Sequence, residues 1–446
     1  MKHASVMNRV IGTAKAAPGW SGLFSPACSA ACPAERAEAT APRIDAPLAV
    51  TRRVNRRTAT MLAGLVALSP FFALPALAQD TSPYDTIIGE AASMAMPDEH
   101  WFAAIGNDIA YIVDGDEGTI GATLTLSMFS PAIEPHLGGG RIYTYGSYYT
   151  RTYYGERTDV VQGFDLTSAL PVSEVEIPPK SAGIGHSGMI GLVEGRFIGV
   201  WNITPAMSVS IVDTNEDTFV GEISTPGCAG VYPVTAGFLM ACGDGRVQYL
   251  RLDSAGKEVA RTRSEPFFTV DEDPVFDYAV PGDSGWLFLS LEGHVFEVTV
   301  DGDEVSVSEP WTINPPDIEG EEDLNGVPIE GDDDWRIGGS QPFAYNAANK
   351  LLVTLMHEGG GQETFEDPGT QIWAFDTVLK RRAYVLDLDE DGAGGKTSAI
   401  EMTSDDRPLL LIPMRGSTDL AVHDALSSRL LHTMTEMDVR KVQRLH

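Results

Sequence analysis

The sequence predicts an all-β fold, a seven-bladed β-propeller with four-stranded antiparallel blades. A strand that ends on Asp, followed by a polar turn and a second strand, recurs seven times at spacings of 51, 48, 40, 48, 75 and 48 residues. No segment shows sustained helical periodicity. A period near fifty with two visible strands per copy is typical of propeller blades, which bury both faces only when neighbouring blades stack.

The recurring aspartate ends the first visible strand of each copy. A carboxylate at that position can accept a hydrogen bond from the backbone amide two residues later and so fix the turn. We therefore interpret these residues as structural rather than catalytic or metal-binding. They are Asp114, Asp165, Asp213, Asp253, Asp301, Asp376 and Asp424.

The remaining strands of the blades are expected between these turns. Apolar runs started by turn residues are typical of inner strands buried on both faces, and four stand out: GRFIGVWNI, AGFLMACG, SGWLFLSLEG and NKLLVTLMHEG. The longest spacing contains a Pro-, Gly- and acid-rich insert between Asn314 and Trp335. We expect this insert to be a loop, because it is too polar for the core.

The N-terminal region of the chain has the features of a secretion signal. The basic stretch RRVNRR, from Arg52, precedes an apolar run over 61–77, and the small-residue motif ALA ends at Ala78. The run is short and broken by prolines, so it predicts a signal peptide cleaved after Ala78, with an uncleaved anchor as the alternative. The expected product is a periplasmic or secreted protein.

We divide the chain accordingly into three parts. Residues 1–78 are the leader and signal peptide, 79–103 an N-terminal arm, and 104–446 the propeller.

The chain is strongly acidic. Its formal net charge is −32, and without residues 1–78 only 22 basic side chains stand against 60 acidic ones. Phosphate binding needs clustered Lys and Arg, so nucleic acid and insertion into an anionic membrane are not expected. A cationic partner or substrate fits better, although solubility explains the same acidity.

Two cysteines remain after the leader, Cys228 and Cys242. In an oxidising compartment this pair suggests one disulfide between neighbouring strands, closing a loop worth about 3 kcal/mol. Two buried free thiols are the alternative, and a metal site built on two cysteines fits less well.

The sequence contains no recognisable catalytic or metal-binding constellation. The nine His lack ligand spacing, and GHSG around Ser187 lacks the G-x-S-x-G pattern. The segment DLDEDGAGGKTS begins like a calcium loop but has Ser398 where a bidentate Glu is needed. We therefore expect no metal and no catalytic residue in this chain.

Three segments resemble the heavy (large) subunit of methylamine and aromatic amine dehydrogenases, the quinoprotein amine dehydrogenase family. They are YTRTYYGERTDVVQGFDLTSALPVSEVEIP, CAGVYPVTAGFLMACGDG and DDDWRIGGSQPFAYNAANKLLVTLMHEGGGQETFEDPGTQIWAFDT. Propeller geometry alone does not require GERTD, the Cys pair and WR-x-GG-x-Q to occur together. The resemblance implies a seven-bladed propeller, in agreement with the seven turns.

The resemblance also implies a function. This chain would be the non-catalytic heavy subunit of a periplasmic heterotetramer of two heavy and two light chains. The light subunit would carry tryptophan tryptophylquinone and oxidise primary amines to aldehyde and ammonia. Electrons would pass to a blue copper protein such as amicyanin or azurin.

Some positions follow from the resemblance alone. Cys228 and Cys242 match the family disulfide. Phe129 falls where the family places a Phe at the inner end of the substrate channel, with a core aromatic between blades as the alternative. Ile337 stands where Pro is usual and Ser340 where an aromatic residue is usual, and these departures leave the interface and the preferred amine open.

Two other functions share these fold-level features. One is a stand-alone periplasmic propeller that binds a ligand or partner without catalysis. The other is a single-chain propeller hydrolase, which would need polar or metal-binding side chains around the central channel.

Overall fold

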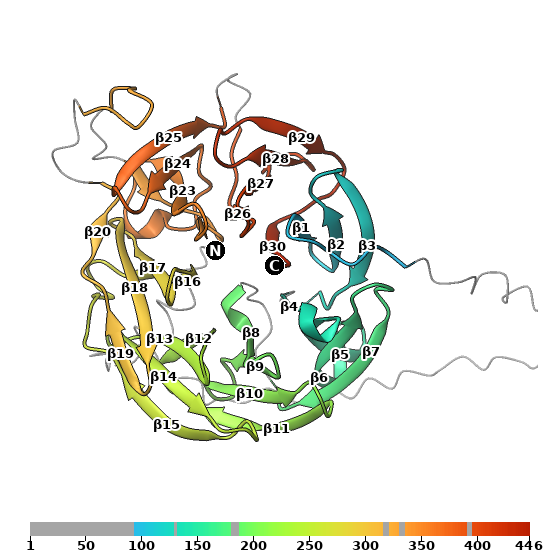
Figure 1. Ribbon diagram of the computed structural model, residues 1–446. Helices are drawn as coiled ribbons and strands as arrows, with labels where there is room; N and C mark the ends of the chain where they lie inside the picture. The colour runs from blue at the N-terminus through green and yellow to red at the C-terminus, as the bar shows by residue number, and fades with distance from the viewer. Residues whose placement is uncertain (1–92, 129–131, 180–186, 315–320, 330–334, 390–394) are drawn as a thin grey trace, which may run out of the picture. The chain divides into compact units, whose positions relative to one another are not determined.

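The computed structural model describes residues 93–446 apart from 129–131, 180–186, 315–320, 330–334 and 390–394. The leader expected over 1–78 and most of the expected arm lie outside these residues. The described residues form seven antiparallel β-sheets arranged in a ring, which confirms the predicted propeller (Figure 1). The helical segments of the described residues are three 3-10 turns: η1 (Leu137–Gly139), η2 (Ser187–Met189) and η3 (Gln362–Thr364).

Three blades consist of four consecutive strands each, ordered from the axis outward. Blade 2 is β4 (Ile133–His136), β5 (Arg141–Arg151), β6 (Tyr154–Asp165) and β7 (Pro171–Ile177). Blade 3 is β8 (Ile190–Val193), β9 (Phe197–Asn202), β10 (Ser208–Asp213) and β11 (Thr218–Ser224). Blade 4 is β12 (Cys228–Val234), β13 (Gly237–Cys242), β14 (Arg246–Leu252) and β15 (Glu258–Arg263).

Blades 5 and 6 each carry one extra short strand, and blade 7 again has four strands. Blade 5 is β16 (Val275–Pro281), β17 (Trp286–Ser290), β18 (His294–Asp301) and β19 (Glu304–Val307), with β20 (Trp311–Thr312) paired to β18. Blade 6 is β21 (Trp335–Ile337) and β22 (Phe343–Asn346), both paired to β23 (Leu351–Glu358), then β24 (Gln371–Asp376) and β25 (Arg381–Asp387). Blade 7 is β26 (Glu401–Met402), β27 (Leu409–Pro413), β28 (Leu420–Asp424) and β29 (Leu430–Met434).

Blade 1 closes the ring because it combines both ends of the propeller. Its strands β1 (Trp101–Ile105), β2 (Ile109–Asp114) and β3 (Thr119–Thr125) come first in the chain, and its inner strand β30 (Lys441–Arg444) comes last. Strand β1 is buried along its whole length and would present an open edge without β30. It begins at Trp101, so it includes residues 101–103, which we had assigned to the arm.

Burial follows position in the blade. The four apolar runs picked out in the sequence form β9, β13, β17 and β23, the second strand from the axis in blades 3 to 6, and these strands are almost completely buried. Outer strands such as β11 and β15 alternate between exposed and partly buried residues. The core therefore lies between stacked blades, as the need to cover both faces of each sheet requires.

The two faces of the ring differ in their connections. Each turn aspartate lies at or directly after the end of the third strand from the axis. Because the order and antiparallel pairing repeat in every blade, these turns lie on one face, which we call the Asp-turn face. The opposite face carries the turns between second and third strands and the links between blades, and it includes Cys228 and Cys242; we call it the disulfide face.

The polar insert lies between β20 and β21, as its place in the longest spacing requires. Its described part, 321–329, is mostly exposed but packs on outer strand β25. Leu324 donates its backbone N–H to the carbonyl of Arg382, and the Asn325 side chain donates to the carbonyl of Ala383. Ile329 is buried, so one apolar residue of this segment does join the covered surface.

Candidate functional site

The disulfide face carries a two-stranded ribbon that extends from blade 2. Strands β5 and β6 have 11 and 12 residues, but β4 pairs with β5 only as far as Thr144, and β7 pairs with β6 only from Asp159. The ribbon beyond these points is rich in tyrosine, and Tyr153 and Tyr154 are 65% and 63% exposed. Exposed, rigid aromatic residues of this kind are typical of protein interfaces.

A buried ion pair holds the root of the ribbon. The guanidinium of Arg157 donates from Nε and Nη2 to the two carboxylate oxygens of Asp159, each at 2.7 Å. The hydroxyl of Ser147 donates to the same carboxylate at 2.5 Å, and the Asp159 side chain is only 1% exposed. A two-point Arg–carboxylate pair fixes geometry as well as charge, so the RTD part of GERTD sets the direction of the ribbon.

Phe129 lies outside the described residues, but both flanks of its segment are tied to β5. The hydroxyl of Ser127 donates to the carbonyl of Ser147 at 3.1 Å and accepts from its N–H at 3.2 Å. On the other side, the hydroxyl of Thr144 donates to the carbonyl of Ala132 at 2.8 Å. The segment that contains Phe129 therefore starts and ends beside the root of the ribbon.

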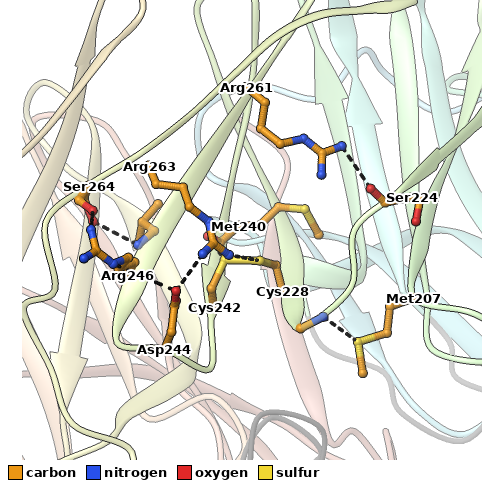
Figure 2. The surroundings of a disulfide bond; sticks show 12 residues. Met207, Ser224, Cys228, Met240, Cys242, Asp244, Arg246, Arg261, Arg263 and Ser264 are labelled. Carbon is orange, nitrogen blue, oxygen red and sulfur yellow. Dashed lines mark hydrogen bonds and ion pairs between the residues drawn. A yellow bond between two sulfur atoms is a disulfide. The ribbon is translucent and has the colours of Figure 1, made fainter. Parts of the chain in front are cut away.

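The cysteines form a disulfide, so the alternative of free thiols is wrong (Figure 2). Cys228 and Cys242 lie directly opposite each other in β12 and β13, and both are buried. The guanidinium of Arg263 donates to the sulfur of Cys228 at 3.3 Å and to the carboxylate of Asp244 at 2.6 Å. The disulfide thus joins the first two strands of blade 4 at the disulfide face.

The WRIGGSQ segment connects blade 6 to the closing strand β30 through hydrogen bonds of Gln341. The side-chain amide of Gln341 donates to the carbonyl of Val442 at 2.7 Å and accepts from its N–H at 3.2 Å, across 101 residues of sequence. Gly339 has φ of 123°, and an added Cβ would lie 2.7 Å from the carbonyl oxygen of Ser398. Two residues of the motif therefore have structural roles. Gln341 connects blade 6 to β30, and Gly339 provides a backbone conformation that favours glycine.

The two positions that differ from the family pattern have different surroundings. Ile337 is completely buried in the core between blades 5 and 6. Ser340 is exposed at the rim of a cavity on the disulfide face, and its hydroxyl donates to the carbonyl of Ser398 at 3.2 Å. A different residue at position 340 therefore changes the exposed rim of the cavity, whereas a different residue at position 337 changes the packing between blades 5 and 6.

The turn aspartates make the expected local bond in six of the seven blades. One carboxylate oxygen accepts from the backbone N–H two residues later at 2.9–3.1 Å. For Asp165, hydrogen bonds from the backbone N–H and the hydroxyl of Ser168, together with those from Thr167, lower the pKa to about 2. For Asp301 the described residues show no such bond, because its two-residue turn is made by Gly302, with φ of 62°, and Asp303.

A cavity of about 230 Å³ lies between the inner strands and is lined by two acidic residues that we did not predict, Glu134 and Glu401. Burial raises the pKa of Glu134 to about 8, partly offset by a hydrogen bond from the N–H of Leu192 at 3.1 Å. Burial also raises the pKa of Glu401, while Arg444 acts in the opposite direction. Glu134 lies in β4 and Glu401 in β26, and both inner strands are too short to show alternation of apolar and polar residues. The sequence therefore contained little information about where these two residues lie.

The next question is whether the described polar residues around the channel could hold a metal ion. Among the residues that the structure describes, no three His, Cys, Asp or Glu side chains come together in a way that could hold a metal ion. Part of the calcium-like segment, 390–394, lies outside those residues. No helix in the described part of the chain has the length and apolar character needed to cross a bilayer.

Comparison with known proteins bears on the whole propeller. Residues 91–442 match the model of the family described as methylamine dehydrogenase heavy chain (MADH). The methylamine dehydrogenase heavy chain of Paracoccus versutus is 26% identical over 357 residues, 78% of each chain, and that of Methylophilus methylotrophus is 22% identical over 296 residues, 65% of this chain and 68% of the relative. Among solved structures, a dihydro-heme d1 dehydrogenase NirN in complex with DHE has a TM-score of 0.49 and 19% identity, covering 78% of this chain and 76% of that chain. The chain belongs to the methylamine dehydrogenase heavy chain family.

Proposed function

We propose that this chain is the non-catalytic heavy subunit of a periplasmic amine dehydrogenase, in which a light subunit carries out the oxidation of primary amines. The observation that carries the proposal is the family match over 91–442, which includes almost the whole described propeller. The signal peptide expected to end at Ala78 fits export to the periplasm.

The disulfide face is the surface proposed to hold the light subunit. Its tyrosine ribbon projects beyond the blade, and the Arg157–Asp159 pair keeps the root rigid. A rigid ribbon loses little conformational entropy on binding, and tyrosine provides a large contact area with a polar end. The light subunit would supply tryptophan tryptophylquinone, so this chain needs no cofactor site of its own.

Phe129 is proposed to line the path of the amine to that cofactor. The proposal is supported by Ser127 and Ala132, the described residues on either side of its segment, which are hydrogen-bonded to β5 beside the root of the ribbon. The acidic surface of the chain would favour a cationic substrate, because amines are protonated at neutral pH. Reduced cofactor would pass electrons to a blue copper protein, in an assembly of two heavy and two light chains.

The first experiment is native purification through this chain from periplasm. The proposal expects a small, cysteine-rich subunit that carries a quinone, whose absorbance is bleached when a primary amine is added. A chain that purifies alone, colourless and inert to amines would contradict the proposal and favour a stand-alone binding propeller.

The second experiment tests the docking face directly. Replacing Tyr153 and Tyr154 together by Ala is expected to weaken association with the light subunit by at least about tenfold, because aromatic anchors dominate interface energies. The matched control replaces Val378 and Leu379 by Ala; they are 69% and 57% exposed in a turn on the Asp-turn face. Equal losses in both variants would exclude the ribbon as the specific docking element.

A further inference from the structure

A second cavity on the disulfide face has the opposite charge to the rest of the chain. It has a volume of about 430 Å³ and lies where blades 6, 7 and 1 meet. Its walls are Ser340 before β22, Ser398 before β26, the loop 413–417 between β27 and β28, and the segment 438–441 that leads into β30. A volume of this size suits a small molecule.

Three of the four charged side chains that line the cavity are basic. Arg415, Arg440 and Lys441 face a single acid, Asp438, in a chain where acidic residues outnumber basic ones about two to one. Among the described residues none of the three cations forms an ion pair within 4.0 Å, whereas eight other Arg side chains and Lys350 do. The positive charge of this cavity is therefore not neutralised by the described part of the chain.

Hydrogen bonds hold the Arg415 side chain and the backbone of two walls of the cavity in place. The guanidinium of Arg415 donates to the hydroxyl of Ser398 at 2.7 Å, and the N–H of Arg415 donates to the carbonyl of Lys396 at 2.8 Å. On the opposite wall, the N–H of Arg440 donates to the carbonyl of Ile105 at 2.9 Å. Because these bonds position the walls before any ligand arrives, binding would require little ordering of the chain.

Lys441 lines the cavity at the residue where the closing strand begins. Burial lowers the pKa of its ammonium group to about 8, while the more distant charge of Asp277 acts in the opposite direction. An anion in the cavity would favour the protonated form, so binding and protonation of Lys441 would support each other.

We infer that this cavity is a binding site for a small oxyanion, a phosphate or a carboxylate, held by Arg415, Arg440 and Lys441. Guanidinium groups bind such anions through two parallel N–H donors, and the serine hydroxyls at the rim add neutral donors. The inference rests on the cavity alone and does not depend on the proposed light subunit.

The test is calorimetric titration of the purified protein, with any subunit that accompanies it, using inorganic phosphate and citrate as separate probes. Saturable binding of at least one probe is expected, weakened about tenfold or more by Arg415→Gln and by Arg440→Gln, since each removes a charged hydrogen-bond donor. Arg407→Gln is the matched control, because Arg407 is an exposed Arg that lines a cavity on the Asp-turn face. It should leave binding unchanged.

The two probes distinguish the source of the anion. Tighter binding of citrate, reduced when Ser340→Phe fills part of the cavity, indicates an organic carboxylate. Tighter binding of phosphate indicates a phosphate group. The inference is overturned if neither probe binds saturably at millimolar concentration, or if Arg407→Gln weakens binding as much as the two cavity variants. Unchanged thermal melting of the variants shows that they are folded, and loss of this binding leaves the amine-dependent bleaching experiment unaffected.

Discussion

The two faces of the propeller carry cavities of opposite charge at the same three blades, 6, 7 and 1. On the disulfide face the cavity of about 430 Å³ holds Arg415, Arg440 and Lys441, none of them in an ion pair among the described residues. On the Asp-turn face, blades 6, 7 and 1 enclose an open cavity of about 740 Å³ that is mainly acidic. There the charge is partly compensated, because His100 lies between Asp116, at 2.7 Å, and Asp405, at 3.0 Å. The cavity on the disulfide face therefore has a net positive charge, and the cavity on the Asp-turn face keeps a net negative charge that His100 offsets only in part.

The connections on the two faces also differ. On the Asp-turn face, six of the seven blades have a short turn in which the Asp carboxylate accepts a hydrogen bond from the backbone N–H two residues later. The disulfide face depends on links between strands or blades: the disulfide, the buried Asp159 at the root of the ribbon, and the hydrogen bonds between Gln341 and Val442. Changes on the disulfide face should therefore have the larger effects on stability.

Removal of the disulfide should have the largest effect. Replacing Cys228 and Cys242 together by Ser is expected to lower the free energy of unfolding by about 3 kcal/mol, because the unfolded chain regains the freedom of a closed loop. Urea denaturation measures this loss, and reduction of the wild-type protein should reproduce it. An unchanged midpoint in both cases would show that the disulfide adds nothing to stability.

The root of the ribbon should be the next most sensitive point. Asp159→Ala is expected to cost about 2 kcal/mol, since Arg157 and Ser147 lose a buried, charged hydrogen-bond partner. The control is Asp217→Asn, because Asn tolerates the φ of 49° at this position and the 2.8 Å pair with Arg141 that it weakens is partly exposed on both sides. It should cost less than about 1 kcal/mol. If both variants unfold at the same urea concentration, burial of Asp159 has no energetic role.

The turns offer a matched pair on one face. Asp165→Ala should lower the free energy of unfolding by about 1 kcal/mol, because two backbone amides and two hydroxyls lose their acceptor. Asp301→Ala should change it by less than about 0.5 kcal/mol, since Gly302 makes that turn. A larger loss for Asp301→Ala than for Asp165→Ala would contradict this account of the turns.

The smallest expected effect is the pH dependence that His100 gives to the acidic cavity. Burial lowers the pKa of His100, but hydrogen bonds and charge from Asp116 and Asp405 outweigh it, so the pKa is raised. The stabilisation is therefore complete below the unfolded pKa, about 6.5, and is lost as pH rises through the folded pKa.

The effect is expected to be on the order of 1 kcal/mol, because Asp116 is 59% exposed and its charge is screened. Urea midpoints measured between about pH 5.5 and 8.5 should decrease more for the wild type than for His100→Gln. Parallel curves would show that the Asp116–His100–Asp405 contact does not contribute to the pH dependence.

Sequence and structure agree best where information is local. The second, third and fourth strands of a blade are long enough to show apolar runs or alternation, and a turn aspartate needs only the backbone two residues away. Three inner strands carried no such signal because they are short: β4 has four residues, β26 two and β30 four. For the same reason, the charged residues on these strands, Glu134, Glu401 and Lys441, could not be placed in advance.

The sequence by itself determined the all-β class, the seven repeats and the position of each turn, because each depends on residues within about one repeat of each other. Only the tertiary structure decided that Gln341 forms hydrogen bonds with Val442. The same is true of the burial of Asp159 beside Arg157 at the root of the ribbon, and of the cavity that Arg415 and Arg440 both line. These contacts join different blades or depend on burial. Closing the ring brings residues far apart in the sequence to the same place, and no local pattern records which ones will meet.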